Sequence, residues 1–131
     1  MKRTALLHAE ISDTIARLGH GDLLVIGDAG LPIPPGPRRI DLALSANIPR
    51  FIDVLRVVLG EMQVEAAILA NEIDERNPVL RGQILTLLPD APIEQISHED
   101  FKALTTRSRA MIRTGEFSPY ANIILRAGVV F

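Results

Sequence analysis

Short apolar runs rich in branched residues alternate with segments of helical spacing along this chain, and glycine or proline marks most boundaries between them. The clearest run is 23–26 (LLVI), which lies between the turn-forming clusters GHGD and GDAG and is typical of a buried strand. The segment 64–73 and the C-terminal run 121–131 are also predicted as strands. Such alternation predicts a single three-layer α/β domain, with helices flanking a central sheet that is mainly parallel or mixed.

Four segments have the apolar spacing of helices, and they lie at 11–18, 51–58, 78–88 and 98–113. Ser12 or Asp13 can cap the first of them, and Gly19 can end it. Ser97 followed by Asp100 forms a capping box, which predicts that the last helix runs from His98 to Arg113 and ends at Gly115. Two short strands are predicted at 40–44 (IDLAL) and 93–96.

The length of 131 residues is enough for one domain, residues 1–131, with its own core. The C-terminal strand has two interpretations: a central strand covered by the chain's own helices, which is favoured, or a strand at an interface between subunits. A hydrophobic content of 47% in so small a domain makes a homo-oligomer plausible.

The composition argues against several classes of partner. A net charge of -2 and 4% aromatic residues provide no basic stripe or stacking platform, so nucleic acid is not expected. The absence of cysteine excludes disulfides and cysteine zinc sites, and it fits a cytoplasmic protein. The first apolar stretch is interrupted by His8, Glu10 and Asp13, which makes it too short for a signal peptide, and no run suits a membrane span.

Common motifs of catalysis are also missing. The glycines of GHGDLLVIGDAG match neither the dinucleotide fingerprint nor the phosphate loop, and no G-x-S-x-G element marks a serine nucleophile. The three histidines do not have the spacing of a metal site, so no metal is expected. Acid-base and hydrogen-bonding chemistry remain.

His20 and Asp28 flank the strand 23–26 and are candidates for that chemistry. His20 can exchange protons near neutrality, although spacing alone favours an exposed loop histidine. Asp28 follows the strand, where ligands collect in open α/β sheets, but it can equally stabilise a turn. In extended chain the two residues would be about 25 Å apart. Either they have separate roles, or the loops fold back, or two subunits contribute to one pocket.

Four segments, in order and spacing, resemble the D-ribose pyranase family, whose relatives include the fucose mutarotases. These segments are LGHGDLLVIGDAGLPIP, EMQVEAAILANEI, SHEDFK and GEFSPYANIILRAGVVF, and together they span nearly the whole chain. The pair Gly30 and Leu31 is similar to the ribose branch of the family.

The resemblance implies an isomerase that interconverts the pyranose and furanose forms of D-ribose without a cofactor. His20 matches the family's acid-base residue, and the sugar-binding positions fall on Asp28, His98, Tyr120 and Asn122. Relatives form ring-shaped homo-oligomers, commonly decamers of two pentamers, which implies the same here. The alternatives are a non-catalytic ribose-binding accessory module and a mutarotase that acts on fucose or a related sugar.

Overall fold

The computed structural model describes residues 1–131 and contains five helices and six strands. The helices are α1 (Ala9–Arg17), α2 (Phe51–Leu59), α3 (Ile73–Arg76), α4 (Pro78–Leu87) and α5 (His98–Thr105). The strands are β1 (Leu23–Gly27), β2 (Arg38–Asp41), β3 (Val64–Ala70), β4 (Ile93–Ile96), β5 (Ala110–Arg113) and β6 (Ile123–Ala127).

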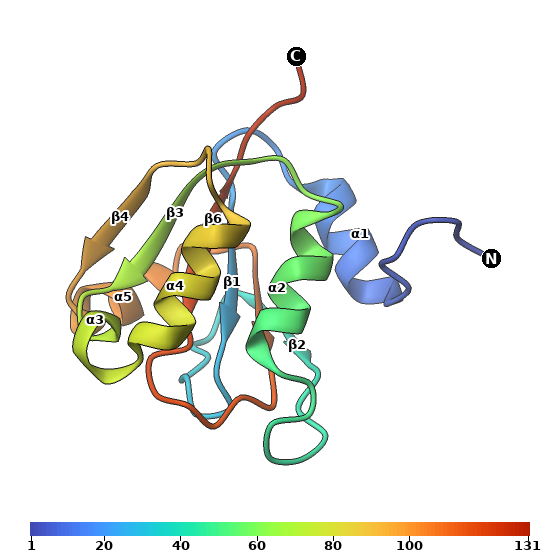
Figure 1. Ribbon diagram of the computed structural model, residues 1–131. Coiled ribbons are helices and arrows are strands. Elements are labelled where there is room, and N and C mark those ends of the chain that lie inside the picture. The colour runs from blue at the N-terminus through green and yellow to red at the C-terminus, as the bar shows by residue number, and fades with distance from the viewer.

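All six strands join one mixed sheet in the order β2-β5-β1-β6-β3-β4 (Figure 1). Strand β6 lies between β1 and β3 and is antiparallel to both, whereas the other neighbouring strands are parallel. Ile123 therefore pairs with Ile26, and Arg126 pairs with Leu23. The predicted mixed sheet is confirmed, and the C-terminal run is a central strand.

Helices cover both faces of the sheet and make the three layers. On one face, Leu24 and Ile26 of β1 belong to the large core that α1, α2 and α4 complete. On the other face, Val25 packs in a smaller core with Phe101 of α5 and with Leu31, which begins the proline-rich loop 31–37. Because side chains alternate between the faces of a strand, β1 contributes to both cores.

The predicted helix over 98–113 is wrong in its second half. Helix α5 ends at Thr105, and residues 110–113 form β5, which is inserted between β1 and β2. The hydroxyls of Thr105 and Ser108 donate to the carbonyls of Lys102 and Thr105, at 2.6 and 2.7 Å. These bonds compete with continued helix, and the free edges of β1 and β2 then pair with the short apolar run.

Two smaller predictions are also wrong. The strand expected at 40–44 is β2, which ends at Asp41, because the Asp41 carboxylate accepts the backbone N–H of Ala43 at 3.1 Å and turns the chain. Neither Ser12 nor Asp13 caps the first helix. His8 does so, since its Nδ1 accepts the N–H of Ile11 at 3.3 Å, and α1 begins at Ala9.

The other predicted elements agree with the structure, except that the strand predicted over 121–131 spans only Ile123–Ala127. Strand β1 extends one residue beyond its prediction, β4 matches 93–96, and α2 and α4 match within a residue or two. The segment 64–73 is a strand as far as Ala70. None of the helices combines the length and apolarity needed to cross a membrane.

Candidate functional site

Asp28 and Asn122 form a paired carboxylate and amide where β1 ends and β6 begins. The antiparallel register brings them together, because Asp28 directly follows β1 and Asn122 directly precedes β6. The Asn122 Oδ1 accepts the N–H of Asp28 at 2.8 Å, and its Nδ2 donates to Asp28 Oδ2 at 3.0 Å. A Cβ at Gly27 would lie only 3.0 Å from Asn122 Oδ1 and 2.6 Å from Leu31 Cδ2, so a larger residue there would force these side chains to shift.

The Asp28 carboxyl is half-buried, and burial raises its pKa above the ordinary value. The backbone N–H of Gly30, which donates to Oδ1 at 2.9 Å, and the amide of Asn122 oppose this shift without cancelling it. Asp28 therefore gains a proton more readily than an exposed aspartate does. Its oxygens can accept hydrogen bonds from hydroxyl groups, and when protonated it can also donate one.

His98 and Tyr120 complete the polar cluster from two other segments. His98 is the first residue of α5, where Ser97 caps the helix and the Glu72 carboxylate accepts the His98 N–H at 2.9 and 3.2 Å. The His98 and Tyr120 rings meet edge to face, with centroids 5.1 Å apart. The His98 Nδ1 is shielded and has no partner within the chain.

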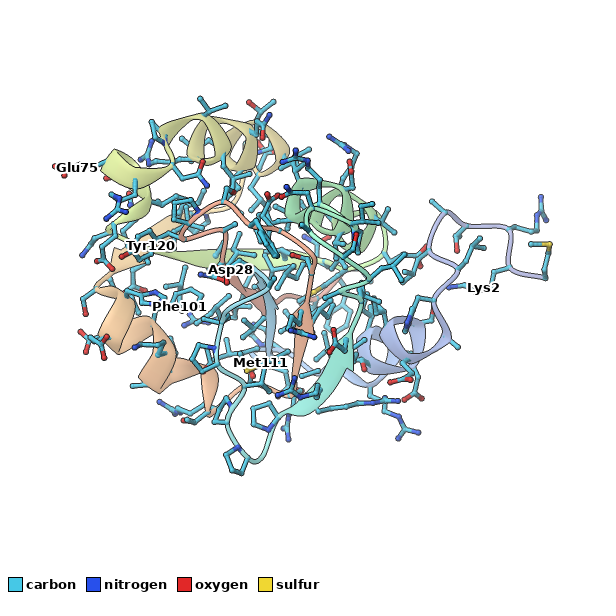
Figure 2. All side chains as sticks on the ribbon, turned by 90° about the horizontal axis from the view of Figure 1, so that it is seen from below. Lys2, Asp28, Glu75, Phe101, Met111 and Tyr120 are labelled. Carbon is cyan, nitrogen blue, oxygen red and sulfur yellow. The ribbon has the colours of Figure 1, made fainter.

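A pocket of about 320 Å³ lies among these side chains. Figure 2 views the molecule from this end and shows Asp28 and Tyr120 near each other, with Phe101 toward α5. The pocket is lined by Asp28, Gly30, Leu31, Pro32, Arg76, His98, Pro119, Tyr120 and Asn122. A carboxylate, an amide, an imidazole, a phenol and a guanidinium provide donors and acceptors for a small, polyhydroxylated molecule.

His20 lies at the opposite end of β1, in the turn between α1 and β1. Its side chain is 62% exposed, and its Nε2 is 2.7 Å from Glu65 Oε2. The two residues share a hollow of about 650 Å³ with Arg107, Arg109 and Arg126. The five residues of β1 span about 16 Å. The structure thus brings Asp28, His98, Tyr120 and Asn122 together and leaves His20 apart, as the strand length predicted.

Sequence reasoning missed three residues that contact the candidate residues. Glu65 is 45 positions from His20, Glu72 binds the backbone of His98, and the Arg76 guanidinium is 6.0 Å from the Tyr120 ring centroid. All three contacts depend on strand pairing or on the path of a loop. A single sequence gives no signal for them.

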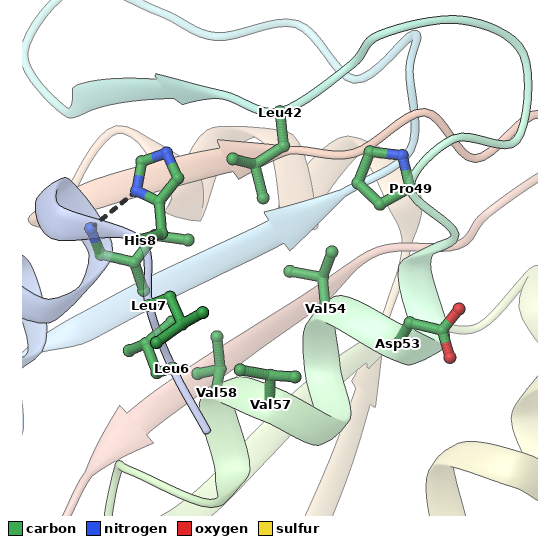
Figure 3. Close-up of a pocket in the computed structure, with 10 residues that line it drawn as sticks. Leu6, Leu7, His8, Leu42, Pro49, Asp53, Val54, Val57 and Val58 are labelled. Carbon is green, nitrogen blue, oxygen red and sulfur yellow. Dashed lines mark hydrogen bonds between the residues drawn. The ribbon is translucent and has the colours of Figure 1, made fainter. Parts of the chain in front are cut away.

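A second, apolar pocket of about 270 Å³ lies between α2 and the segment before α1 (Figure 3). Its polar side chains are engaged elsewhere, because His8 caps α1 and Asp53 pairs with Arg56 at 2.9 Å. Leu6, Val54 and Val58 make most of its wall apolar, which does not suit a sugar. No group of three or more His, Asp or Glu side chains is gathered as a metal ion would need.

The comparisons with known proteins cover the whole chain. The family model described as the RbsD / FucU transport protein family matches residues 1–130. A D-ribose pyranase of Chloroflexus aggregans is 56% identical over 131 residues, with both chains fully covered. A D-ribose pyranase of Variovorax paradoxus is 62% identical over 138 aligned positions, again with both chains fully covered.

Solved structures show the same fold. Bacillus subtilis RbsD complexed with D-ribose is 46% identical and superposes with a TM-score of 0.97, with each chain fully covered. The fucose mutarotase of Streptococcus pneumoniae in complex with L-fucose has a TM-score of 0.83 at 24% identity, again with each chain fully covered. The second likeness is one of fold alone.

Proposed function

The chain belongs to the RbsD / FucU transport protein family, and from that membership we propose that it interconverts the pyranose and furanose forms of D-ribose, the activity of a D-ribose pyranase. The observation that carries the proposal is the pocket of Asp28, His98, Tyr120 and Asn122, in a chain that superposes closely on a ribose-bound relative. The enzyme is an isomerase, because opening and closing the sugar ring changes neither its composition nor its oxidation state.

We assign sugar binding to this pocket. The Asp28 carboxylate is suited to accept hydrogen bonds from sugar hydroxyls, and its bonds to Asn122 and Gly30 fix its orientation. The side chains of His98 and Tyr120 add a second side to the pocket. These groups would hold the sugar by its hydroxyl groups while the sugar ring opens and closes.

We assign proton transfer to His20. Opening the cyclic hemiacetal removes the proton of the anomeric hydroxyl and delivers a proton to the ring oxygen, so the C1–O bond of the ring breaks and an aldehyde forms. Attack by a different hydroxyl on that aldehyde reverses both transfers and gives the other ring size. A neutral imidazole takes the first proton, and the imidazolium returns one. Positioned acid-base catalysis of this kind contributes about 10² to 10⁴-fold.

His20 and the sugar pocket lie at opposite ends of β1, so we propose that a site is completed between subunits. Charge supports a head-to-tail contact of this kind. The His20 end carries Arg107 and Arg126 without ion-pair partners, and the opposite end carries Glu75 and Asp100, also unpaired (Figure 2 shows Glu75 at the rim). A head-to-tail contact repeated by rotation closes into a ring.

For the assembly we propose a homo-oligomer, with the decamer of two pentameric rings that the family resemblance implies. Light scattering coupled to size-exclusion chromatography gives the mass directly, and a monomer at micromolar concentration would overturn the shared site. We propose the cytoplasm as the location of the reaction, which cell fractionation checks.

Magnetisation-transfer NMR on D-ribose, with and without the protein, tests the function. An enzyme accelerates exchange between the pyranose and furanose signals at substoichiometric concentration. A ribose-binding module would broaden the signals without faster exchange. The same measurement on L-fucose separates the two branches of the family, because a fucose mutarotase would accelerate exchange between the fucose anomers and leave ribose unchanged.

A further inference from the structure

We propose that Glu65 is a positioning residue, which selects the tautomer of His20 and aims its ring at the substrate. The inference rests on the proposed function, because it deepens the assigned role of His20. Its basis is the shortest polar contact of the His20 ring, 2.7 Å from Nε2 to Glu65 Oε2, between groups on separate segments.

An irregularity in β3 explains why Glu65 reaches His20. Val64 pairs with Ala127 of β6 and Ala66 pairs with Arg126, so Glu65 is one extra residue on β3 with no partner opposite. Such a β-bulge breaks the regular alternation and redirects the side chain of the extra residue. Gly128 packs against the bulge, where a Cβ would lie 3.0 Å from Glu65 Cβ. The bulge therefore orients the Glu65 side chain, and Gly128 leaves space beside it.

The turn that carries His20 is fixed just as closely. The Asp22 carboxylate accepts the N–H of Gly19 at 2.9 Å and pairs with Arg109, also at 2.9 Å. Gly21 takes a φ of +84°, which glycine adopts without strain, and its N–H donates to the Ala127 carbonyl at 2.8 Å. Both the turn and the bulge are thus bonded to the end of β6. Only the exposed His20 side chain is left to be positioned, and Glu65 is the group that contacts it.

The chemistry of the pair determines which nitrogen can react. An ionised carboxylate only accepts hydrogen bonds, so Glu65 requires the proton of neutral His20 to reside on Nε2. The lone pair on Nδ1 is then free to take the proton of the anomeric hydroxyl. Once His20 is protonated, the charge of Glu65 stabilises the imidazolium without moving. A glutamine at position 65 can either accept from Nε2 or donate to it, so it no longer selects one tautomer.

The test compares Glu65→Gln with Glu94→Gln, a matched change of an exposed glutamate on β4 that has no ion-pair partner. Ring ¹⁵N NMR on the intact protein assigns the tautomer of neutral His20. We expect Nε2–H in the wild type and in the control, and a mixture in Glu65→Gln. We also expect kcat for ribose exchange to fall roughly 10-fold, with KM little changed, because Glu65 acts on proton transfer and not on the sugar pocket.

A second arm shows whether Glu65 acts through His20. In a His20→Ala background, the added Glu65→Gln change should leave the residual exchange rate unaltered. An unchanged tautomer and unchanged kcat in Glu65→Gln would overturn the inference while leaving the proposed function intact. A further loss in the His20→Ala background would overturn it too, since Glu65 would then have a separate role. Absence of ribose exchange in the wild type would instead remove the proposed function, and the NMR measurement would still decide the tautomer.

Discussion

The two ends of β1 differ in construction, although polar side chains lie next to the strand at both ends. At the start of β1, His20 stands 62% exposed on a turn that backbone bonds hold. At its end, Asp28 and the buried Asn122 bind each other and line a preformed pocket. The difference separates two requirements of the proposed site. Under the proposed function, the pocket that would bind the sugar lies within one chain, whereas the proposed acid-base residue His20 lies on a surface that a second chain would cover.

The largest contrast between the ends is expected from His20→Ala. We expect ribose exchange to slow by about 10² to 10⁴-fold, because a positioned acid-base group is lost. The free energy of unfolding should change by less than about 0.5 kcal/mol, since the side chain is exposed and supports no packing. Magnetisation-transfer NMR and urea denaturation measure the two effects. Wild-type exchange in this variant would refute the assignment of His20.

Asn122→Ala should affect both stability and binding, because Asn122 is 1% exposed. The change leaves the N–H of Asp28 without its acceptor and the carboxylate without a donor, which costs about 1–3 kcal/mol of unfolding free energy. Ribose affinity should fall as well. Urea denaturation and ribose titration check these effects, with Asn71→Ala, an exposed asparagine, as the control. If Asn122→Ala were as stable as that control, the hydrogen bonds between Asp28 and Asn122 would not contribute to stability.

The same contrast explains what could be read from the sequence. The run 23–26 and its flanking glycines were enough to predict β1 and the separation of His20 from Asp28, because both depend on local spacing. The family resemblance singled out His98, Tyr120 and Asn122, which the structure places with Asp28 in one pocket. Their roles in binding stay predictions.

Features that depend on strand pairing were not predictable. Residues 98–113 have continuous helical spacing, yet β5 forms there because the sheet leaves a place between β1 and β2. The contact of Glu65 with His20 depends on a bulge in the β3–β6 ladder. Local spacing carries no information on either, since both are settled by residues far away in the chain.

Mixed assemblies test whether the two ends meet between subunits. Subunits with His20→Ala and subunits with Tyr120→Phe should each be impaired alone, the first in proton transfer and the second in sugar binding. If one site takes its histidine from one subunit and its tyrosine from the next, about a quarter of the sites in a random mixture regain both groups. The exchange rate after co-refolding measures the recovery. No recovery in verified mixed assemblies would contradict a shared site.

The smallest expected effect is that the pKa values of the two aspartates that flank β1, Asp22 and Asp28, are shifted in opposite directions. The N–H of Gly19 and then the Arg109 guanidinium lower the pKa of Asp22, whereas burial raises that of Asp28, both relative to an ordinary value of 3.8. Carboxyl ¹³C NMR should therefore show Asp22 titrating below this value and Asp28 above it. A shared midpoint would mean that the two ends do not differ in their electrostatics.

The stability of the protein should respond to the two groups in opposite directions. Ionised Asp22 stabilises the fold above pH 3.8, and this contribution is lost as the pH falls through its lowered pKa. Asp22→Asn should thus be destabilising near neutrality and neutral in strong acid. Ionisation of Asp28 opposes folding as the pH rises through its raised pKa, so the stability of Asp28→Asn relative to wild type should increase over that range. Urea denaturation at several acidic pH values measures how the unfolding free energy of each variant, relative to wild type, changes with pH. The same pH dependence in both variants would indicate that the effect of burial on Asp28 is offset by its hydrogen bonds.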